Sequence, residues 1–237
     1  MRLIHLKSTG STNREAKLLA DKADFGPLWV LADEQLDGRG RRGRDWVSPP
    51  GNLYISHLFP TQKHPEELGQ YSFVAALAVF DCLVAIYPDG EFGIKWPNDI
   101  LLSGKKVSGL LLETGKSQKQ QYVILGIGVN LISHPKDTAY PASSLVVHCG
   151  DMPAIEDIVR LLADKFNYWN DRYIELGFSY IREAWMSRAQ NIPGPVKVRL
   201  PAEEFEGEAL GLDQNGALQV RQASGSIRNV HAGDVFY

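Results

Sequence analysis

An arginine- and glycine-rich segment is the part of this 237-residue sequence best suited to chemistry. Residues 38–44 read Gly-Arg-Gly-Arg-Arg-Gly-Arg, and so many glycines predict a loop. Glycine lets the backbone approach a ligand closely, and arginine presents a planar fork that suits carboxylates and phosphates. The loop is therefore a candidate anion clamp. A solvated basic loop and an RNA-binding Arg/Gly segment are the alternatives.

The overall composition argues against several classes of protein. The net charge of −3 disfavours a general nucleic-acid binder, which is normally basic over a whole face. The two cysteines form no CxxC pair, and the six histidines show no HxH or HExxH spacing, so we expect no built-in metal site. We identify no signal peptide and no apolar run long enough to cross a bilayer. We therefore expect a cytoplasmic protein with reduced thiols and no membrane partner.

A second polar segment, residues 11–13, reads Ser-Thr-Asn and precedes a helical pattern of apolar residues. Thr12 followed three residues later by Glu15 fits a capping box, which predicts that a helix begins here. Capping alone would explain these residues. The first turn of a helix also presents free N–H groups to a polar ligand, which is the functional alternative.

A third segment, residues 95–99, reads Lys-Trp-Pro-Asn-Asp. Because proline has no N–H group to donate, the strand predicted over 94–102 must kink, end or lie at an edge there. Residues 103–106 predict a tight turn that places Lys105 and Lys106 at the mouth of a β-hairpin. Protection of a sheet edge is the alternative explanation for these lysines. The segment does not match a phosphate-binding P-loop.

A fourth segment, residues 126–131, reads Gly-Ile-Gly-Val-Asn-Leu after a strand predicted over 122–125. Its glycines indicate close approach by a ligand or by a neighbouring strand. The polar, proline-broken stretch 133–150 that follows predicts a loop able to order over a ligand.

The apolar pattern predicts an α+β fold with a mixed β-sheet. The aromatic stripe of the last predicted helix indicates core packing rather than contact with a cofactor. After Ile192, short strands separated by turns predict a small β-barrel appendage. We therefore divide the chain into a domain over residues 1–190 and a β domain over 191–237. Strands are predicted over 3–6, 28–32 and 53–59, and helices over 70–86 and 155–185, with a break near Gly177.

The four segments gain chemical meaning if they converge on one pocket. Cations from the arginine loop and from Lys106, with neutral polar groups of 11–13 and 126–130, suit a small polar acid together with a nucleotide. The sequence has no evident Ser/His/Asp or Cys/His arrangement for a nucleophile. The residues alone therefore indicate a protein that binds, or acts on, anionic and phosphorylated ligands.

Taken in order, the segments resemble the motifs of the biotin–protein ligases. Residues 34–46 resemble the signature loop of that family. Residues 95–99, with Lys106 and Gly109, are similar to its second motif, 126–131 to its third and 11–13 to its first. The resemblance implies that family's class II synthetase-like catalytic domain, which is a mixed β-sheet with helices, followed by a small SH3-like β-barrel.

The resemblance also implies a two-step reaction. The carboxylate of biotin attacks the α-phosphate of ATP, which gives biotinyl-5′-AMP and pyrophosphate. A lysine of a biotin carrier protein domain then attacks the mixed anhydride and releases AMP. The usual acceptor in the family is the carrier subunit of acetyl-CoA carboxylase. Mg²⁺ is expected to arrive with ATP rather than in a site built by the protein.

Roles for single residues follow from the same resemblance. Lys106 is expected to bridge the biotin carboxylate and the α-phosphate, and Asp99 to orient Lys106 or to accept the proton of the incoming lysine. Arg39 and Arg41 complete the expected catalytic set. Ser11, Thr12 and Gln35 resemble the groups that bind the ureido ring of biotin, and Asn130 resembles a polar group near the adenylate. The full ligand-binding set is Ser11, Thr12, Asn13, Gln35, Gly38, Arg39, Gly40, Arg41, Arg42, Arg44, Trp46, Lys106, Gly109, Gly128 and Asn130.

The resemblance leaves partners and two alternatives open. Some family members carry a DNA-binding helix-turn-helix domain, but here the motifs begin at Ser11, so we expect no specific DNA binding. A homodimer is expected by analogy with relatives that pair through sheet edges. The alternatives are a ligase of the same fold for lipoate or another carboxylic acid, and a non-catalytic nucleotide- or RNA-binding protein.

Overall fold

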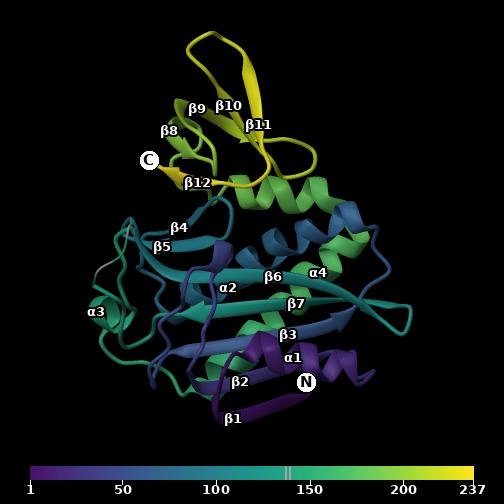
Figure 1. Cartoon of the computed structure of the whole chain (residues 1–237). Coiled ribbons are helices and arrows are strands. Elements are labelled where there is room, and N and C mark those ends of the chain that lie inside the picture. Colours follow the sequence, from purple (N-terminus) through teal and green to yellow (C-terminus); the bar gives the residue numbers. More distant parts are fainter. Residues whose placement is uncertain (137, 139) are drawn as a thin grey trace.

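A seven-stranded mixed sheet forms the centre of the molecule (Figure 1). The computed structural model describes residues 1–136, 138 and 140–237. The strand order is β1-β2-β3-β7-β6-β5-β4, in which β1 and β2 pair in parallel and the other neighbours are antiparallel. The predicted mixed sheet is thereby confirmed. Its strands are β1 (Leu3–Thr9), β2 (Leu28–Gln35), β3 (Leu53–Pro60), β4 (Phe92–Lys95), β5 (Asp99–Leu102), β6 (Lys105–Ser117) and β7 (Gln120–Val129).

Helices cover both faces of this sheet because alternate residues of its strands point to opposite sides. In β2, Leu28 and Val30 pack on one face with α1, whereas Trp29 and Leu31 pack on the other face with α2 and α4. This double burial explains why the first five residues of β2, 28–32, are all apolar. The helices are α1 (Thr12–Asp21), α2 (Tyr71–Ile86), α3 (Val146–Cys149) and α4 (Ile155–Met186), with 3-10 turns η1 (Arg41–Gly43) and η2 (Pro65–Gln70).

The stretch Pro65–Ile86, which contains η2 and α2, corrects one expectation. It is long and apolar enough to cross a membrane by length and composition, contrary to the prediction that no run is. Most of it is buried inside the protein, where α2 packs against α4 and the sheet. A core helix of this kind passes the same test as a membrane span, so its apolar character here serves the core.

Helix α4 is the long aromatic-striped helix predicted from the sequence. Phe166, Trp169, Tyr173 and Trp185 are all buried, so their prediction as core residues is confirmed. The helix changes direction at Gly177, whose φ of 75° is a left-handed value that favours glycine.

The C-terminal segment folds as a five-stranded antiparallel sheet, which confirms the predicted all-β appendage. The boundary at residue 190/191 stays a prediction, although β8 begins at Gly194. Trp96 fastens this sheet to the central one, because its buried indole N–H donates to the carbonyl of Gly216 at 3.1 Å. The strand order is β11-β10-β9-β8-β12, with β8 (Gly194–Arg199), β9 (Glu204–Leu212), β10 (Leu218–Arg221), β11 (Ile227–Val230) and β12 (Asp234–Phe236).

One local prediction is wrong, and of the alternatives given for Pro97 the structure shows one. Thr12 and Glu15 do not form a capping box: Ser11 is the N-cap without a side-chain cap, and Glu15 instead accepts a hydrogen bond from Thr9 at 2.7 Å. The strand predicted over 94–102 ends before Pro97 rather than kinking there, and the segment forms the two antiparallel strands β4 and β5. Their register pairs Lys95 with Asp99, so the proline lies in the turn.

Candidate active site

A cavity of about 430 Å³ opens where the central sheet, the arginine loop and the C-terminal sheet meet. Most of the residues predicted from the four segments line it. Gly38 and Arg42 do not: Gly38 is buried beneath the loop, and Arg42 points toward the C-terminal sheet. The predicted residues that line the cavity are Ser11, Thr12, Asn13, Gln35, Arg39, Gly40, Arg41, Arg44, Trp46, Asp99, Lys106, Gly109, Gly128 and Asn130.

Neutral side chains from the start of α1 and the end of β2 form one wall. Gln35 Oε1 accepts hydrogen bonds from the backbone N–H of Thr12 at 2.9 Å and from its hydroxyl at 3.1 Å. Gln35 Nε2 donates to Ser48 Oγ at 3.0 Å, and the Ser48 hydroxyl donates to the carbonyl of Trp46 at 2.7 Å. This chain of bonds ties the helix start to the end of the arginine loop, so the two segments hold a fixed relative position.

An indole ring lies across the strands at the base of the cavity. Gly109 of β6 and Gly128 of β7 stand opposite each other, and a Cβ on either glycine would overlap or crowd the Trp46 ring. The glycines therefore allow the ring to rest on the backbone of the sheet. The indole Nε1 is buried without a hydrogen-bond partner among the described residues. Such an unpaired donor is expected to find a partner when a polar ligand enters.

Positive charge lies beside the Trp46 ring and in the arginine loop. Lys106 Nζ lies 2.6 Å from Asp99 Oδ1 and 5.3 Å from the centre of the Trp46 ring. Arg41 donates from Nη1 to Asn98 Oδ1 at 3.2 Å, and burial lowers the pKa of its guanidinium. Asp99 therefore holds the Lys106 ammonium in place, and Asn98 does the same for the Arg41 guanidinium.

Lys95 is a cavity residue that the predicted set omitted. It is buried, and its Nζ lies 3.6 Å from the centre of the Tyr140 ring, over which it makes a cation–π contact. Burial lowers its pKa to about 8, so the side chain is still mostly charged at neutral pH. The signal that could have identified Lys95 as a site residue was its place at the start of the Lys-Trp-Pro-Asn-Asp segment.

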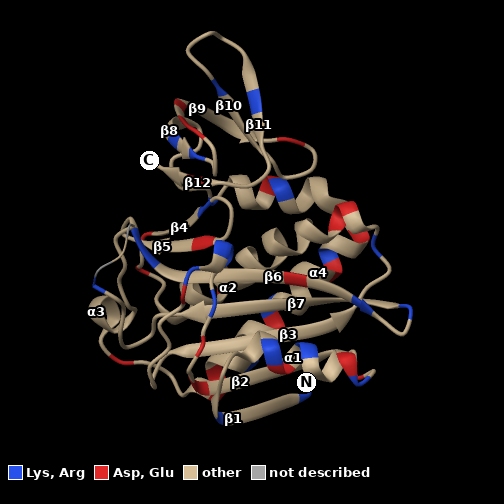
Figure 2. Cartoon of the chain, in the orientation of Figure 1, with Lys and Arg blue, Asp and Glu red and all other residues tan. Residues whose placement is uncertain are grey.

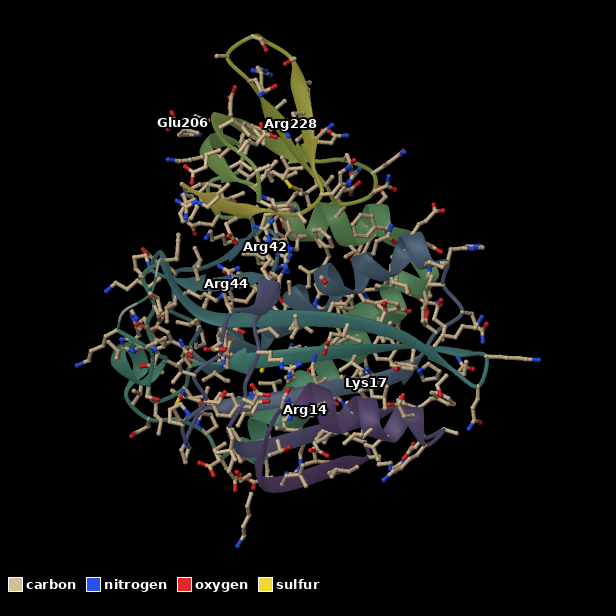
Figure 3. The ribbon with its side chains drawn as sticks, in the orientation of Figure 1. Arg14, Lys17, Arg42, Arg44, Glu206 and Arg228 are labelled. Atoms are coloured by element: carbon tan, nitrogen blue, oxygen red, sulfur yellow. The ribbon has the colours of Figure 1, made fainter. Side chains whose placement is uncertain are left out.

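The C-terminal sheet also reaches the cavity, and no local sequence pattern predicted this. Asp234, at the start of β12, accepts from Arg44 at 3.0 Å and from Arg42 at 3.4 Å. Figure 3 shows Arg42 and Arg44 between the two sheets. Arg199 and Phe236 line the same side. The arginine loop is thus attached to both sheets, through Ser48 on one side and Asp234 on the other.

The segment after β7 runs beside the entrance of the cavity. Asn130 Nδ2 donates to the carbonyl of Ser143 at 3.0 Å, and Lys106 forms an isolated parallel bridge with Ala142. Asn130 therefore anchors this segment next to Lys106. The predicted closing loop 133–150 includes Asp137 and Ala139, which lie outside the described residues.

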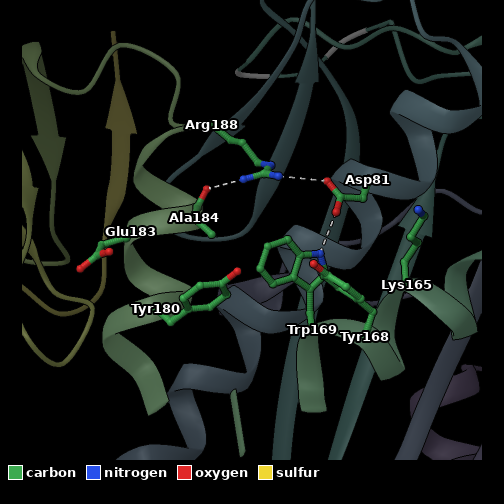
Figure 4. Close-up of a pocket in the computed structure, with 8 residues that line it drawn as sticks. All are labelled: Asp81, Lys165, Tyr168, Trp169, Tyr180, Glu183, Ala184 and Arg188. Carbon is green, nitrogen blue, oxygen red and sulfur yellow. Dashed lines mark hydrogen bonds and ion pairs between the residues drawn. The ribbon is translucent and has the colours of Figure 1, made fainter. Parts of the chain in front are cut away.

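A second hollow lies on the helical side of the molecule, between α2 and the two halves of α4 (Figure 4). Asp81 accepts a hydrogen bond from Trp169 Nε1 at 2.8 Å and pairs with Arg188 at 3.5 Å. None of the predicted site residues lines it. Its lining contains two acidic and two basic residues, Asp81, Glu183, Lys165 and Arg188, so the hollow does not gather one sign of charge as the first cavity does.

The positive charge of the first cavity is a local feature of the molecule. In the view of Figure 2, the positions of acidic and basic residues are interspersed along the chain. Among the residues that the structure describes, no group of three His, Cys, Asp or Glu side chains is placed to hold a metal ion. The cavity therefore offers an anion site made of lysine and arginine beside a neutral hydrogen-bonding wall.

Comparison with known proteins gives the same picture along the whole chain. The model of the biotin/lipoate A/B protein ligase family matches residues 6–130, and that of the biotin protein ligase C terminal domain matches residues 195–237. A biotin–[acetyl-CoA-carboxylase] ligase of Paracoccus denitrificans is 41% identical over 98% of this chain and 99% of its own length. The bifunctional ligase/repressor BirA of Bacillus subtilis is 33% identical over 98% of this chain and 73% of its own length.

Solved structures agree with the sequences. A biotin protein ligase from Aquifex aeolicus in complex with biotin and ATP superposes with a TM-score of 0.84 at 27% identity, covering 99% of this chain and 97% of that one. A biotin protein ligase from Leishmania major in complex with biotinyl-5-AMP gives 0.67 at 26% identity, covering 98% and 99%. The motifs, the fold and the near-complete coverage lead to one conclusion: this chain belongs to the biotin protein ligases.

Proposed function

We propose that this chain is a biotin–[acetyl-CoA-carboxylase] ligase, which activates biotin with ATP and transfers it to a lysine of a carrier protein domain. The observation that carries the proposal is the composition of the cavity. A neutral hydrogen-bonding wall from α1 and β2 faces a set of fixed cations, and the two lie in one space. This combination suits a small molecule with a polar neutral ring at one end and a carboxylate at the other.

In the first step, an oxygen of the biotin carboxylate forms a bond to the α-phosphorus of ATP. The bond from that phosphorus to the bridging oxygen breaks, and pyrophosphate leaves. Two anions must meet, so fixed positive charge at the meeting point lowers the barrier. We assign this role to Lys106, which Asp99 already orients at 2.6 Å. Arg39, Arg41 and the buried Lys95 add positive charge around the phosphates.

In the second step, the neutral amine of the acceptor lysine attacks the acyl carbon of biotinyl-5′-AMP. An amide forms, the acyl–phosphate bond breaks, and AMP leaves while the amine loses a proton. Asp99 is the nearest carboxylate to Lys106 on the cavity wall and is the group to which we assign that proton. The proton would reach Asp99 directly or by way of Lys106.

The arginine loop would keep the adenylate away from water between the two steps. Its attachment to Ser48 and to Asp234 supports this role, because both ends of the loop are held over the cavity. Mg²⁺ would enter bound to the phosphates of ATP, since Asp99 is already paired with Lys106.

Other properties of the protein are part of the same proposal. The acceptor would be a biotin carrier domain, and the site of action would be the cytoplasm. We propose no specific DNA contact by these 237 residues. A homodimer through a sheet edge is the proposed assembly, because β1 is an edge strand. Sedimentation with and without biotin and ATP would test the assembly.

Pyrophosphate release with Mg-ATP and biotin, run beside lipoate, tests the activity. The intact mass of an added biotin carrier domain tests the transfer. The proposal predicts biotin-dependent release and one added biotin mass on the carrier. Release with lipoate alone would assign the sister activity, and no release with either acid would indicate a nucleotide binder.

A further inference from the structure

Ser56 of β3 is a buried hydroxyl that lies directly behind the neutral wall of the cavity. It is 0% exposed and is not among the residues that line the cavity. Its Oγ lies 2.7 Å from Thr12 Oγ1 and 2.6 Å from Asn13 Oδ1. Thr12 and Asn13 both line the cavity, so Ser56 touches the wall from inside the protein.

The orientation of the Asn13 side chain makes its Oδ1 an acceptor for the Ser56 hydroxyl. Asn13 Nδ2 donates to Glu113 Oε2 at 2.7 Å, so its Oδ1 must face the other way, toward Ser56. Gly126 of β7 makes room for this approach, since a Cβ there would overlap Asn13 Oδ1. Asn13 Oδ1 needs a donor at this buried position, and the Ser56 hydroxyl is within reach.

A serine hydroxyl has a single proton, so Ser56 donates to only one of its two neighbours at a time. When Ser56 donates to Asn13, the Thr12 hydroxyl donates to Gln35. When Ser56 donates to Thr12, the Thr12 proton goes to Gln35. In every arrangement the Thr12 proton is held inside the protein and a lone pair of Thr12 Oγ1 remains for the cavity.

We infer that Ser56 is a positioning residue that fixes Thr12 as a hydrogen-bond acceptor for a ligand N–H group. The inference rests on the proposed function, in which the ligand is biotin and its ureido ring supplies that N–H. A ligand with no ring N–H, such as lipoate, gains nothing from this arrangement. Ser56 thereby contributes to the choice of acid without touching it. The oriented Thr12 oxygen can accept a hydrogen bond from a ring N–H of biotin, but it finds no donor on the ring of lipoate.

The test compares Ser56→Ala with Ser108→Ala. Ser108 is the matched control because it is also a fully buried serine of the central sheet, and its hydroxyl donates to the backbone carbonyl of Gly128 at 2.7 Å. We expect Ser56→Ala to raise the KM for biotin about tenfold, the loss expected from one hydrogen bond, while kcat and the KM for ATP stay within about twofold. Ser108→Ala is expected to leave the KM for biotin within about twofold.

A double-variant cycle shows whether Ser56 acts through Thr12. In a Thr12→Val background, Ser56→Ala is expected to change the KM for biotin less than twofold, because the hydroxyl that Ser56 positions is gone. Independent, multiplying losses would overturn the inference, as would an unchanged KM in Ser56→Ala. Ser56→Cys, of similar size with a weaker donor, provides the second variant should the alanine protein not fold. A wild-type KM for biotin in that variant counts against the inference.

The activity of the wild-type protein distinguishes failure of this inference from failure of the proposed function. Pyrophosphate release with biotin in the wild type, together with an unchanged KM in Ser56→Ala, overturns this inference alone. A wild type that releases no pyrophosphate with biotin overturns the proposed function and this inference with it.

Discussion

The two sides of the cavity are built in different ways. The floor, defined here as the start of α1, the end of β2 and the glycines of β6 and β7, is buried and bonded to the sheet. The arginine loop opposite is exposed over most of its length and is held by side chains, through Ser48, Asn98 and Asp234. The floor as defined is neutral, whereas the cations come from the loop and, at its edge, from Lys95 of β4 and Lys106 of β6.

This difference assigns different tasks to the two sides. A buried, preorganised surface distinguishes ligands by shape and hydrogen bonds, so the floor would select the ring of the acid. Fixed charges act most strongly on groups whose charge changes during reaction, so the cationic side would accelerate the attack on the phosphate. Substitutions on the floor should therefore change affinity for the acid, and substitutions on the cationic side should change the rate.

Lys106→Ala is expected to have the largest effect. Removing a preorganised charge from the reacting groups lowers the rate of adenylate formation by about 10²–10³-fold, with little change in the affinity for biotin. Single-turnover pyrophosphate release measures the rate. The adjacent exposed Lys105→Ala is the matched control and should be near wild type. A rate in Lys106→Ala within threefold of wild type would remove this residue from the mechanism.

Gly128→Ala is expected to come next. The added methyl group would overlap the Trp46 ring, which must then move off the floor. Overpacking of this kind costs about 1–3 kcal/mol of stability, and we expect the KM for biotin to rise about tenfold or more. Gly69→Ala is the control, since nothing lies within 4 Å of a Cβ at that position. If the KM for biotin stays at its wild-type value in Gly128→Ala, the floor does not depend on the position of Trp46.

Lys95→Met tests the cost of the buried cation. Its folded pKa of about 8 lies below the ordinary value of 10.5, so between these pH values the unfolded chain binds more protons and wild-type stability rises with pH. The methionine protein should therefore be more stable at pH 7, by roughly 1–3 kcal/mol, and lose this advantage as the pH approaches 10. Its rate of adenylate formation should fall several-fold. Denaturant unfolding at pH 7 and near pH 10 measures the free energy of unfolding of both proteins. If the two proteins differ by the same amount at both pH values, the prediction is contradicted.

Asp234→Asn is expected to have the smallest effect. Partly exposed ion pairs contribute up to about 1 kcal/mol each, so weakening those with Arg42 and Arg44 should speed release of the adenylate a few-fold. Labelling of an unrelated protein by escaped adenylate measures this release. Glu208→Gln, which loses a pair with Arg221 on the same C-terminal sheet, serves as the control. Equal labelling by the two variants would show that the ion pairs of Asp234 with Arg42 and Arg44 do not slow the release of the adenylate.

Local patterns in the sequence predicted what depends on neighbours in the chain. The glycines between 38 and 43 predicted a loop, and the apolar period predicted the main helices and strands. The capping box failed because a tertiary partner took over Glu15: Thr9 of the adjacent strand end bonds it. Pro97 predicted that the strand over 94–102 kinks, ends or lies at an edge, and the strand ends there, because Pro97 lies in the turn between β4 and β5.

Contacts between distant segments account for the parts of the site that the sequence did not predict. Asp234 lies about 190 residues from Arg42 and Arg44, and nothing near it in the sequence indicates an arginine partner. Ser56 lies in an apolar strand, and its meaning comes only from the helix start that packs on it. The roles of the predicted site residues stay predictions, although the structure brings most of them to one cavity.

One measurement tests most directly whether the floor sets the affinity for biotin and the cations set the rate. Single-turnover adenylate formation is followed across biotin concentrations for the wild type, Gly128→Ala and Lys106→Ala, at saturating Mg-ATP. We expect Gly128→Ala to raise the half-saturating biotin concentration and to keep the plateau rate within about threefold of wild type. Lys106→Ala is predicted to lower the plateau by about 10²–10³-fold at a nearly unchanged half-saturating concentration. The opposite pattern, or a loss of both quantities in both variants, would contradict this assignment.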